Sequence, residues 1–160
     1  MMKVHYIMTC LLFVTVSLLG VNKACAQKTT TDYTQLATEV LQLVNEHRAG
    51  LGLPALKMNA MITKVAASHS ANMASGKVPF SHDGFDDRVA MINKQIKTAN
   101  AWAENVAEGP RTAKSVVDMW LHSPEHKKNI EGHYDLTGIA ISKSVTGEVF
   151  YTELFVHAGK

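Results

Sequence analysis

The residues best suited to chemistry are four histidines and one glutamate in the second half of the chain: His82, His122, His126, His133 and Glu104. Imidazole titrates near neutral pH and is the commonest metal ligand among side chains. Glu104 lies among apolar neighbours in "WAENVAEG", so we expect its carboxylate to be half-buried. A half-buried carboxylate needs a partner, and histidine is a natural one. These residue types therefore predict a His/Glu cluster.

The spacing of these residues does not by itself indicate which chemistry the cluster carries out. No HExxH pair, nucleophile elbow or Gly-rich phosphate loop occurs in the sequence. Both cysteines, Cys10 and Cys25, precede residue 27, so the rest of the chain has no thiolate metal site and no cysteine nucleophile. Three uses of the cluster stay open: a divalent metal site, a hydrogen-bonded network that orders a cleft, and a catalytic centre with Glu104 as general base.

The N-terminus is typical of a secretory signal peptide over residues 1–26. Lys3 is followed by the uncharged apolar run "IMTCLLFVTVSLLGV" and by the small-residue cleavage signal "ACA". We expect cleavage near Ala26-Gln27 and a secreted location, extracellular or periplasmic, with lipid anchoring at Cys25 the less favoured alternative. The run is shorter than the roughly 20 residues of a membrane span, so no transmembrane span is expected in the mature chain.

The charge balance argues against a nucleic-acid surface. Lys3 and Lys23 are the only charged residues of the leader, so 14 of the 16 basic residues and all 14 acidic residues remain after its removal. Nucleic-acid binding requires clustered Lys and Arg, and only "EHKKN" is locally basic. After the leader we expect a polar tail over residues 27–34 and one domain over residues 35–160, whose oligomeric state stays open.

The elements that must position the cluster are predicted to be helices first and a β-hairpin last. Helical spacing of apolar residues covers residues 34–50, 60–75, 86–98 and 112–123. Residues 99–110 favour an extended passage, and alternation predicts strands over residues 135–142 and 148–156. This order predicts an α+β domain with a C-terminal β-hairpin.

Several single residues have expected places in these elements. Asn45 and Arg48 are expected to tie the first helix to the rest of the domain. His69 lies on the apolar stripe of the second helix, where a hydrogen-bonded core histidine and a cleft residue are both open interpretations. His157 is expected in a frayed tail, and the pattern does not say which way Glu153 faces.

Five local patterns follow one another along the chain: "LVNEHRAGLGLPALKMNAMITKVAASHSANMA", "FSHDGFDDRV", "AENVAEG", "VVDMWLHSPEHKKNI" and "YDLTGIAIS" with "VFYTELF". In this order they resemble the bacterial branch of the CAP superfamily, whose SCP/TAPS domain occurs in cysteine-rich secretory proteins, venom allergens and plant pathogenesis-related proteins. The resemblance covers about residues 35–156. It implies an α-β-α sandwich, in which a central antiparallel sheet is flanked by helices.

The resemblance also implies a surface cleft lined by two His and two Glu. The first His falls on His82 of "SHDG", the first Glu on Glu104 of "AEN", and the second His on His133 of "GHYD". In some relatives this cluster binds a divalent cation. That property predicts Zn²⁺, or another divalent cation, on His82, His133 and Glu104.

The fourth cleft position departs from the family pattern. The second Glu of relatives lies three residues after the Trp of the fourth helix, where this chain has Ser123. Glu125 or His126 of "SPEH" could occupy that space, and a Ser-Pro-x-His sequence is typical of bacterial members.

Two functions follow as expectations. The first is a secreted CAP-domain protein whose cleft takes up a small ligand, lipid or peptide, with or without a metal; the absence of a nucleophile motivates it. The alternative is a metal- or His/Glu-dependent hydrolase acting on peptide or cell-wall material, with Glu104 as general base. An interaction or stability role at the cell surface is a third hypothesis.

Overall fold

A four-stranded sheet is the middle layer of the structure, a computed structural model that describes residues 21–159. The strands lie in the order β1-β3-β4-β2, with bounds β1 Lys57–Met58, β2 Ala99–Glu108, β3 Leu136–Lys143 and β4 Val149–Ala158. β4 pairs antiparallel with both β2 and β3, whereas the two-residue β1 pairs parallel with β3. The three long strands confirm the expected antiparallel sheet and its C-terminal hairpin, and β1 adds a short parallel edge.

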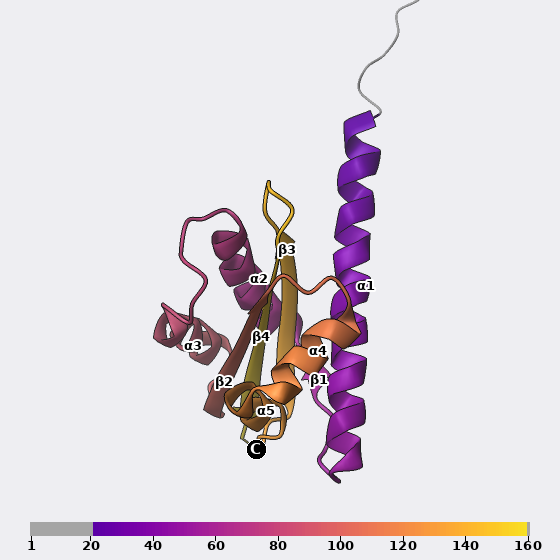
Figure 1. Cartoon of the computed structure of the whole chain (residues 1–160). Helices are drawn as coiled ribbons and strands as arrows, with labels where there is room; N and C mark the ends of the chain where they lie inside the picture. Colours follow the sequence, from indigo (N-terminus) through magenta and orange to yellow (C-terminus); the bar gives the residue numbers. More distant parts are fainter. Residues whose placement is uncertain (1–20, 160) are drawn as a thin grey trace, which may run out of the picture.

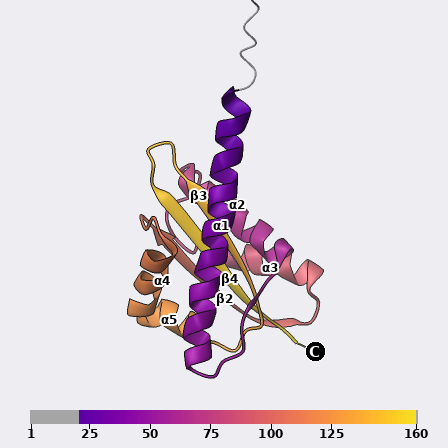
Figure 2. The same ribbon diagram turned by 90° about the vertical axis from the view of Figure 1, so that its right-hand side faces the viewer.

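Helices cover both faces of this sheet (Figures 1 and 2). α1 (Val21–Gly50) and α4 (Ala113–His122) lie on one face, and α2 (Ala60–Ala74) and α3 (Phe85–Gln95) lie on the other. The short α5 (Pro124–Ile130) packs against α4 and β2. The arrangement is the α-β-α sandwich that the resemblance implies.

The first helix begins earlier than the apolar pattern predicts. α1 runs from Val21 and includes residues 27–34, which were expected to form a polar tail. The predicted signal peptide lies mostly outside the described residues, so its cleavage and the division of the chain stay predictions. Within residues 21–159, no helix combines the length and the apolar character that a membrane crossing requires.

Apolar side chains fill the spaces on both sides of the sheet. On the α1 side, Trp120 is fully buried and its Nε1 donates to the backbone O of Val106 at 3.1 Å. On the opposite side, α2 is capped by Asn59, whose Oδ1 accepts from the backbone N of Met61 and Ile62. The predicted inward face of α2, from Ile62 through His69 to Met73, is buried.

Arg48 and Asn45 tie the end of α1 to the rest of the domain, as predicted. The Arg48 side chain is fully buried and donates to four backbone carbonyls, those of Pro54, Ile130, Gly132 and Tyr134. Asn45 exchanges two hydrogen bonds with the backbone of Leu56. These contacts join α1 to the segment after it and to the connection between α5 and β3.

Glu153 of β4 is fully buried, because helices cover both faces of the central strand. Its Oε1 accepts from Thr137 Oγ1 at 3.2 Å, and its Oε2 has no hydrogen-bond partner among the described residues. Burial raises the pKa of this carboxyl to about 8, against the smaller lowering effects of Thr137 and of the Arg48 charge. Glu153 is therefore mostly neutral at pH 7.

We expect Glu153→Gln to remove a pH dependence of the free energy of unfolding. A carboxyl whose pKa is raised on folding stabilises the fold fully below its ordinary value of 4.5, and that contribution is lost as the pH rises through about 8. Urea unfolding at pH 5 and pH 8.5 should show a smaller loss of stability in the variant than in the wild type.

Glu39→Gln is the control, because Glu39 is exposed on α1. It should lose as much stability as the wild type between the two pH values. An equal loss in Glu153→Gln would contradict the neutral, buried carboxyl.

Candidate functional site

Glu104 and His82 lie together on the α3 side of the sheet. β2 carries Glu104, whose side chain is only 2% exposed, and the loop between α2 and α3 carries His82, whose side chain is 52% exposed. His82 Nδ1 lies 2.9 Å from Glu104 Oε1. The Asp83-Gly84 turn bends the chain at this point, since Gly84 has φ +75° and α3 starts directly after it.

A buried arginine that the sequence analysis did not single out holds the Glu104 carboxylate. Arg88 Nε donates to Glu104 Oε2 at 2.6 Å, and Arg88 Nη2 donates to Oε1 at 2.7 Å. Burial alone would raise the pKa of Glu104, but hydrogen bonds from His82 and Arg88 and the Arg88 charge lower it below its ordinary value. One signal could have found the pair: Arg88 precedes the buried Ile92 by four residues and so shares its inward helix face.

The same guanidinium also binds the loop that carries His82. Arg88 Nη1 donates to Asp83 O at 2.9 Å, and Arg88 Nη2 donates to His82 O at 3.2 Å. The loop backbone and the Glu104 carboxylate are thus held by one side chain.

His69 is a buried neighbour of this cluster. Its Nε2 lies 3.0 Å from Ser81 O, and its Nδ1 lies 3.3 Å from Arg88 Nη1. A carbonyl only accepts, so Nε2 carries the hydrogen and Nδ1 accepts from Arg88. Burial, and then the Arg88 charge, lower the pKa of His69, which keeps the ring neutral. His69 is therefore a hydrogen-bonded core histidine that also supports the cluster.

α5 brings His126 close to His82. The two ring centroids are 6.5 Å apart, and burial lowers the pKa of His126, followed by the charge of His82. Asn105 Nδ2 donates to His126 O at 3.1 Å, and Asn129 Nδ2 donates to Glu104 O at 3.1 Å. These two bonds fix α5 against β2. His126 Nδ1 is buried and has no hydrogen-bond partner among residues 21–159.

The other two cleft candidates are both exposed. His133 is exposed in the segment between α5 and β3, and Glu125 is exposed in the first turn of α5. In the part of the chain that the structure describes, no hydrogen bond, ion pair or ring contact joins either of them to His82 or Glu104. His126 is the candidate that the fold brings near His82, and the roles of all three stay predictions.

Two further histidines, His122 and His157, lie outside the cluster around Glu104. His122 is exposed at the end of α4, with Nδ1 2.7 Å from Asp118 O. The expectation of a frayed tail at His157 is wrong: this residue belongs to β4, and its Nδ1 lies 3.1 Å from Asp135 Oδ1. The backbone N of Ala158 donates to the same oxygen at 2.7 Å, which holds the strand to its end.

The arrangement of donors around Glu104 does not fit a zinc site. Both carboxylate oxygens already accept from the Arg88 guanidinium, whose positive charge would oppose a second cation. Among the described residues, no three His, Cys, Asp or Glu side chains form a group that could hold a metal ion. Zinc on His82, His133 and Glu104 stays a prediction that this geometry does not favour.

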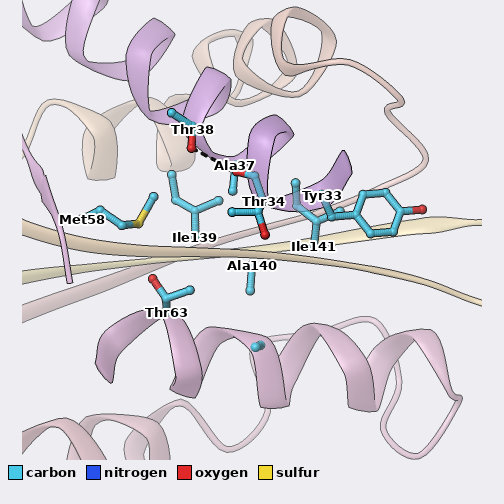
Figure 3. Close-up of a pocket in the computed structure, with 10 residues that line it drawn as sticks. Tyr33, Thr34, Ala37, Thr38, Met58, Thr63, Ile139, Ala140 and Ile141 are labelled. Atoms are coloured by element: carbon cyan, nitrogen blue, oxygen red, sulfur yellow. Dashed lines mark hydrogen bonds between the residues drawn. The ribbon is translucent and has the colours of Figure 1, made fainter. Parts of the chain in front are cut away.

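A separate groove lies along the opposite edge of the sheet, between α1 and α2 (Figure 3). β1 pairs only with Leu136 and Thr137 of β3, so from Gly138 onward the edge of β3 that faces away from β4 has no strand beside it in the described chain. The space there has a volume of about 400 Å³. Its apolar lining comes from Ala37, Met58, Ala67, Ile139 and Ile141.

The groove also has hydroxyl groups at its walls. Figure 3 shows Ile139 and Ile141 on the α1 side of β3 and Thr63 on the α2 side. Thr63 Oγ1 is buried without a hydrogen-bond partner among the described residues, whereas Thr38 Oγ1 donates to Thr34 O at 3.0 Å. An occupant of the groove would therefore meet mainly apolar walls, with the unpaired Thr63 hydroxyl buried in the wall. The sequence could not indicate this site, because a strand edge exists only in the assembled sheet.

Comparison with known proteins gives a consistent family. The family model described as "CAP: Cysteine-rich secretory protein family" matches residues 41–155. A curated relative, "Uncharacterized protein YkwD" of Bacillus subtilis (strain 168), is 29% identical over 123 residues. The match covers 74% of this chain but 46% of the relative, so the chain spans about half of that protein's length.

Solved structures share the fold. An extracellular protein containing a SCP domain from Bacillus anthracis superposes with a TM-score of 0.67 at 24% identity, covering 82% of this chain and 43% of that chain. An outer surface protein from Borrelia burgdorferi gives a TM-score of 0.65 at 24% identity, covering 74% of this chain and 89% of that chain.

We expect Glu104→Gln to destabilise the fold by about 3–5 kcal/mol at pH 7, because it leaves the buried Arg88 guanidinium without its counter-charge. The contribution of Glu104 is present above its ordinary pKa of 4.5 and is lost as the pH falls through its lowered folded pKa. Urea unfolding should therefore show a difference between wild type and variant that shrinks in acid.

The matched control is Glu108→Gln, at the exposed end of the same strand. It should unfold close to the wild type. Similar stabilities for the two variants at pH 7 would contradict a structural role for the Glu104 charge.

Proposed function

The chain belongs to the CAP family, the cysteine-rich secretory protein family, and on that premise we propose that it is an extracellular binding domain for a small ligand, lipid or peptide. The groove along the open edge of β3 is the observation that carries this proposal. The proposed location follows the predicted signal peptide and agrees with the extracellular and outer-surface descriptions of the structural relatives.

The lining of the groove favours a ligand with an apolar chain and one hydrogen-bonding group. The small side chains of Ala37 and Ala67 leave room between the two helices, while Ile139 and Ile141 supply apolar walls. A mostly apolar pocket with a few polar groups is the usual form of a small-molecule site. The Thr63 hydroxyl is buried in the wall without a partner among the described residues, and a turn of its side chain into the groove would let it orient the polar end of such a ligand.

The groove extends toward the β3–β4 turn. A second hollow, which shares Tyr33 and Ile141 with it, reaches Ser144 and Gly147 of that turn. A chain longer than the first space could continue into the second. This continuity favours an elongated ligand, such as a lipid, over a compact one.

The hydrolase alternative has less support from the geometry. A general base needs a free lone pair within reach of the proton that it removes. Glu104 accepts two hydrogen bonds from Arg88 and one from His82, and its side chain is almost fully buried. We therefore place Glu104 in the framework of the cluster rather than at a reacting bond.

The test is the binding of a fluorescent polyene fatty acid to the purified protein. We expect saturable binding, and we expect Ala67→Phe to weaken it about tenfold or more, because the ring would fill space between α1 and α2. Thr63→Val should keep the binding but lose the preference for the acid over its methyl ester.

Ala90→Phe on the exposed face of α3 is the matched control and should bind as the wild type does. Absence of saturable binding, or equal affinities in Ala67→Phe and Ala90→Phe, would refute the groove as the binding site.

A further inference from the structure

The Arg88 side chain uses all of its donors inside the His/Glu cluster. A guanidinium has five N–H groups and no acceptor. Two of them bind the Glu104 carboxylate, two bind loop carbonyls, and one points to a histidine ring; the partner atoms are Glu104 Oε1, Glu104 Oε2, His82 O, Asp83 O and His69 Nδ1. No donor of this buried cation is left for solvent or for a ligand.

Three successive carbonyls of the loop are held in this way. Ser81 O accepts from His69 Nε2, and the next two, His82 O and Asp83 O, accept from Arg88. Loops that carry a binding side chain are usually more mobile than the elements that they connect. Here the hydrogen bonds from His69 and Arg88 hold the backbone of residues 81–83, so the His82 ring is attached to a backbone of fixed position.

The hydrogen-bond pattern also fixes which nitrogen of His82 faces outward. An ionised carboxylate only accepts hydrogen bonds. His82 Nδ1 therefore carries a hydrogen and donates it to Glu104 Oε1. In the neutral ring, Nε2 is then the acceptor. The His82 side chain is half exposed, and the centroid of the His126 ring is 6.5 Å from that of His82.

We propose that Arg88 is the built-in cation of this cluster: it takes the position on Glu104 that a divalent metal ion would need, and it thereby presents His82 Nε2 as an open acceptor beside His126. The matching ligand group is a hydrogen-bond donor, such as a hydroxyl or an amide N–H, and not a metal ion. Arg88 acts through Glu104 and the loop, so it is a positioning residue.

The experiment uses the full chain labelled with ¹⁵N and the zinc ion alone as the probe. Long-range ¹H–¹⁵N correlation spectra at pH 8 should show His82 protonated on Nδ1 and His69 protonated on Nε2. The Arg88 Nε–H resonance, which reports the 2.6 Å bond to Glu104, should keep its position when zinc is added in excess.

An internal reference is present in the same molecule. His47 Nε2 lies 2.9 Å from Glu131 Oε1, in a His–carboxylate pair that is partly exposed and has no arginine on the carboxylate among the described residues. We expect its spectrum to show the opposite tautomer, with Nε2 protonated. His82 must differ from His47 in the same spectrum.

Arg88→Lys tests the positioning role, because lysine keeps the charge but has three donors and no planar fork. We expect the His82 tautomers to become mixed and the amide signals of residues 81–83 to broaden, while Arg111→Lys at an exposed position changes neither. If Arg88→Lys does not fold, the proposal is tested by the wild-type spectra alone, through the His82 tautomer and the response of the Arg88 Nε–H signal to zinc. A His82 protonated on Nε2, or loss of the Arg88 Nε–H signal at one equivalent of zinc, would overturn the proposal.

Discussion

The buried charge of Glu104 is the constraint on which the rest of the site depends. A carboxylate that is almost completely removed from water is costly unless it is paired and hydrogen-bonded. The chain meets this requirement with Arg88, which the first turn of α3 delivers to the sheet. Because that arginine is buried too, its remaining donors need partners, and the loop carbonyls before α3 supply them. The position of His82 follows from this sequence of requirements.

The two edges of the sheet have opposite characters. At the β2 edge, Asn105 and Asn129 bind backbone and side-chain groups between the strand and α5, so polar side chains close that edge beside the histidines. At the β3 edge, the sheet ends in two residues of β1 and then in an apolar groove between helices. An unpaired strand edge invites association with other chains. The helices α1 and α2 flank that edge (Figure 1) and limit the access, so the edge is the wall of a pocket (Figure 3).

Local patterns predicted the elements but not every contact between them. The stripe of α2, the Asn59 cap and the final hairpin follow from spacing that acts within a few residues, so the sequence was sufficient. The pairing of His82 with Glu104 came from the family resemblance. The facing of Glu153 could not be read from alternation, because residues on both faces of β4 are buried.

Other parts of the site depend on how elements dock. α5 has only seven residues, so its sequence did not show whether Glu125 or His126 would lie near His82. Arg88 follows two aspartates in the first turn of α3, where a charged residue is usually exposed. It nevertheless lies on the same helix face as the buried Ile92. The groove needed the assembled edge of β3, which no single segment contains.

Arg48 has a consequence for the order in which the chain can fold. Three of the carbonyls that it binds lie 82, 84 and 86 residues further along the chain. α1 is synthesised first, yet its C-terminal end cannot dock until Tyr134 has left the ribosome, and closing so long a loop costs entropy before the contacts form. The nascent chain is therefore kept from completing its tertiary structure until late in translation.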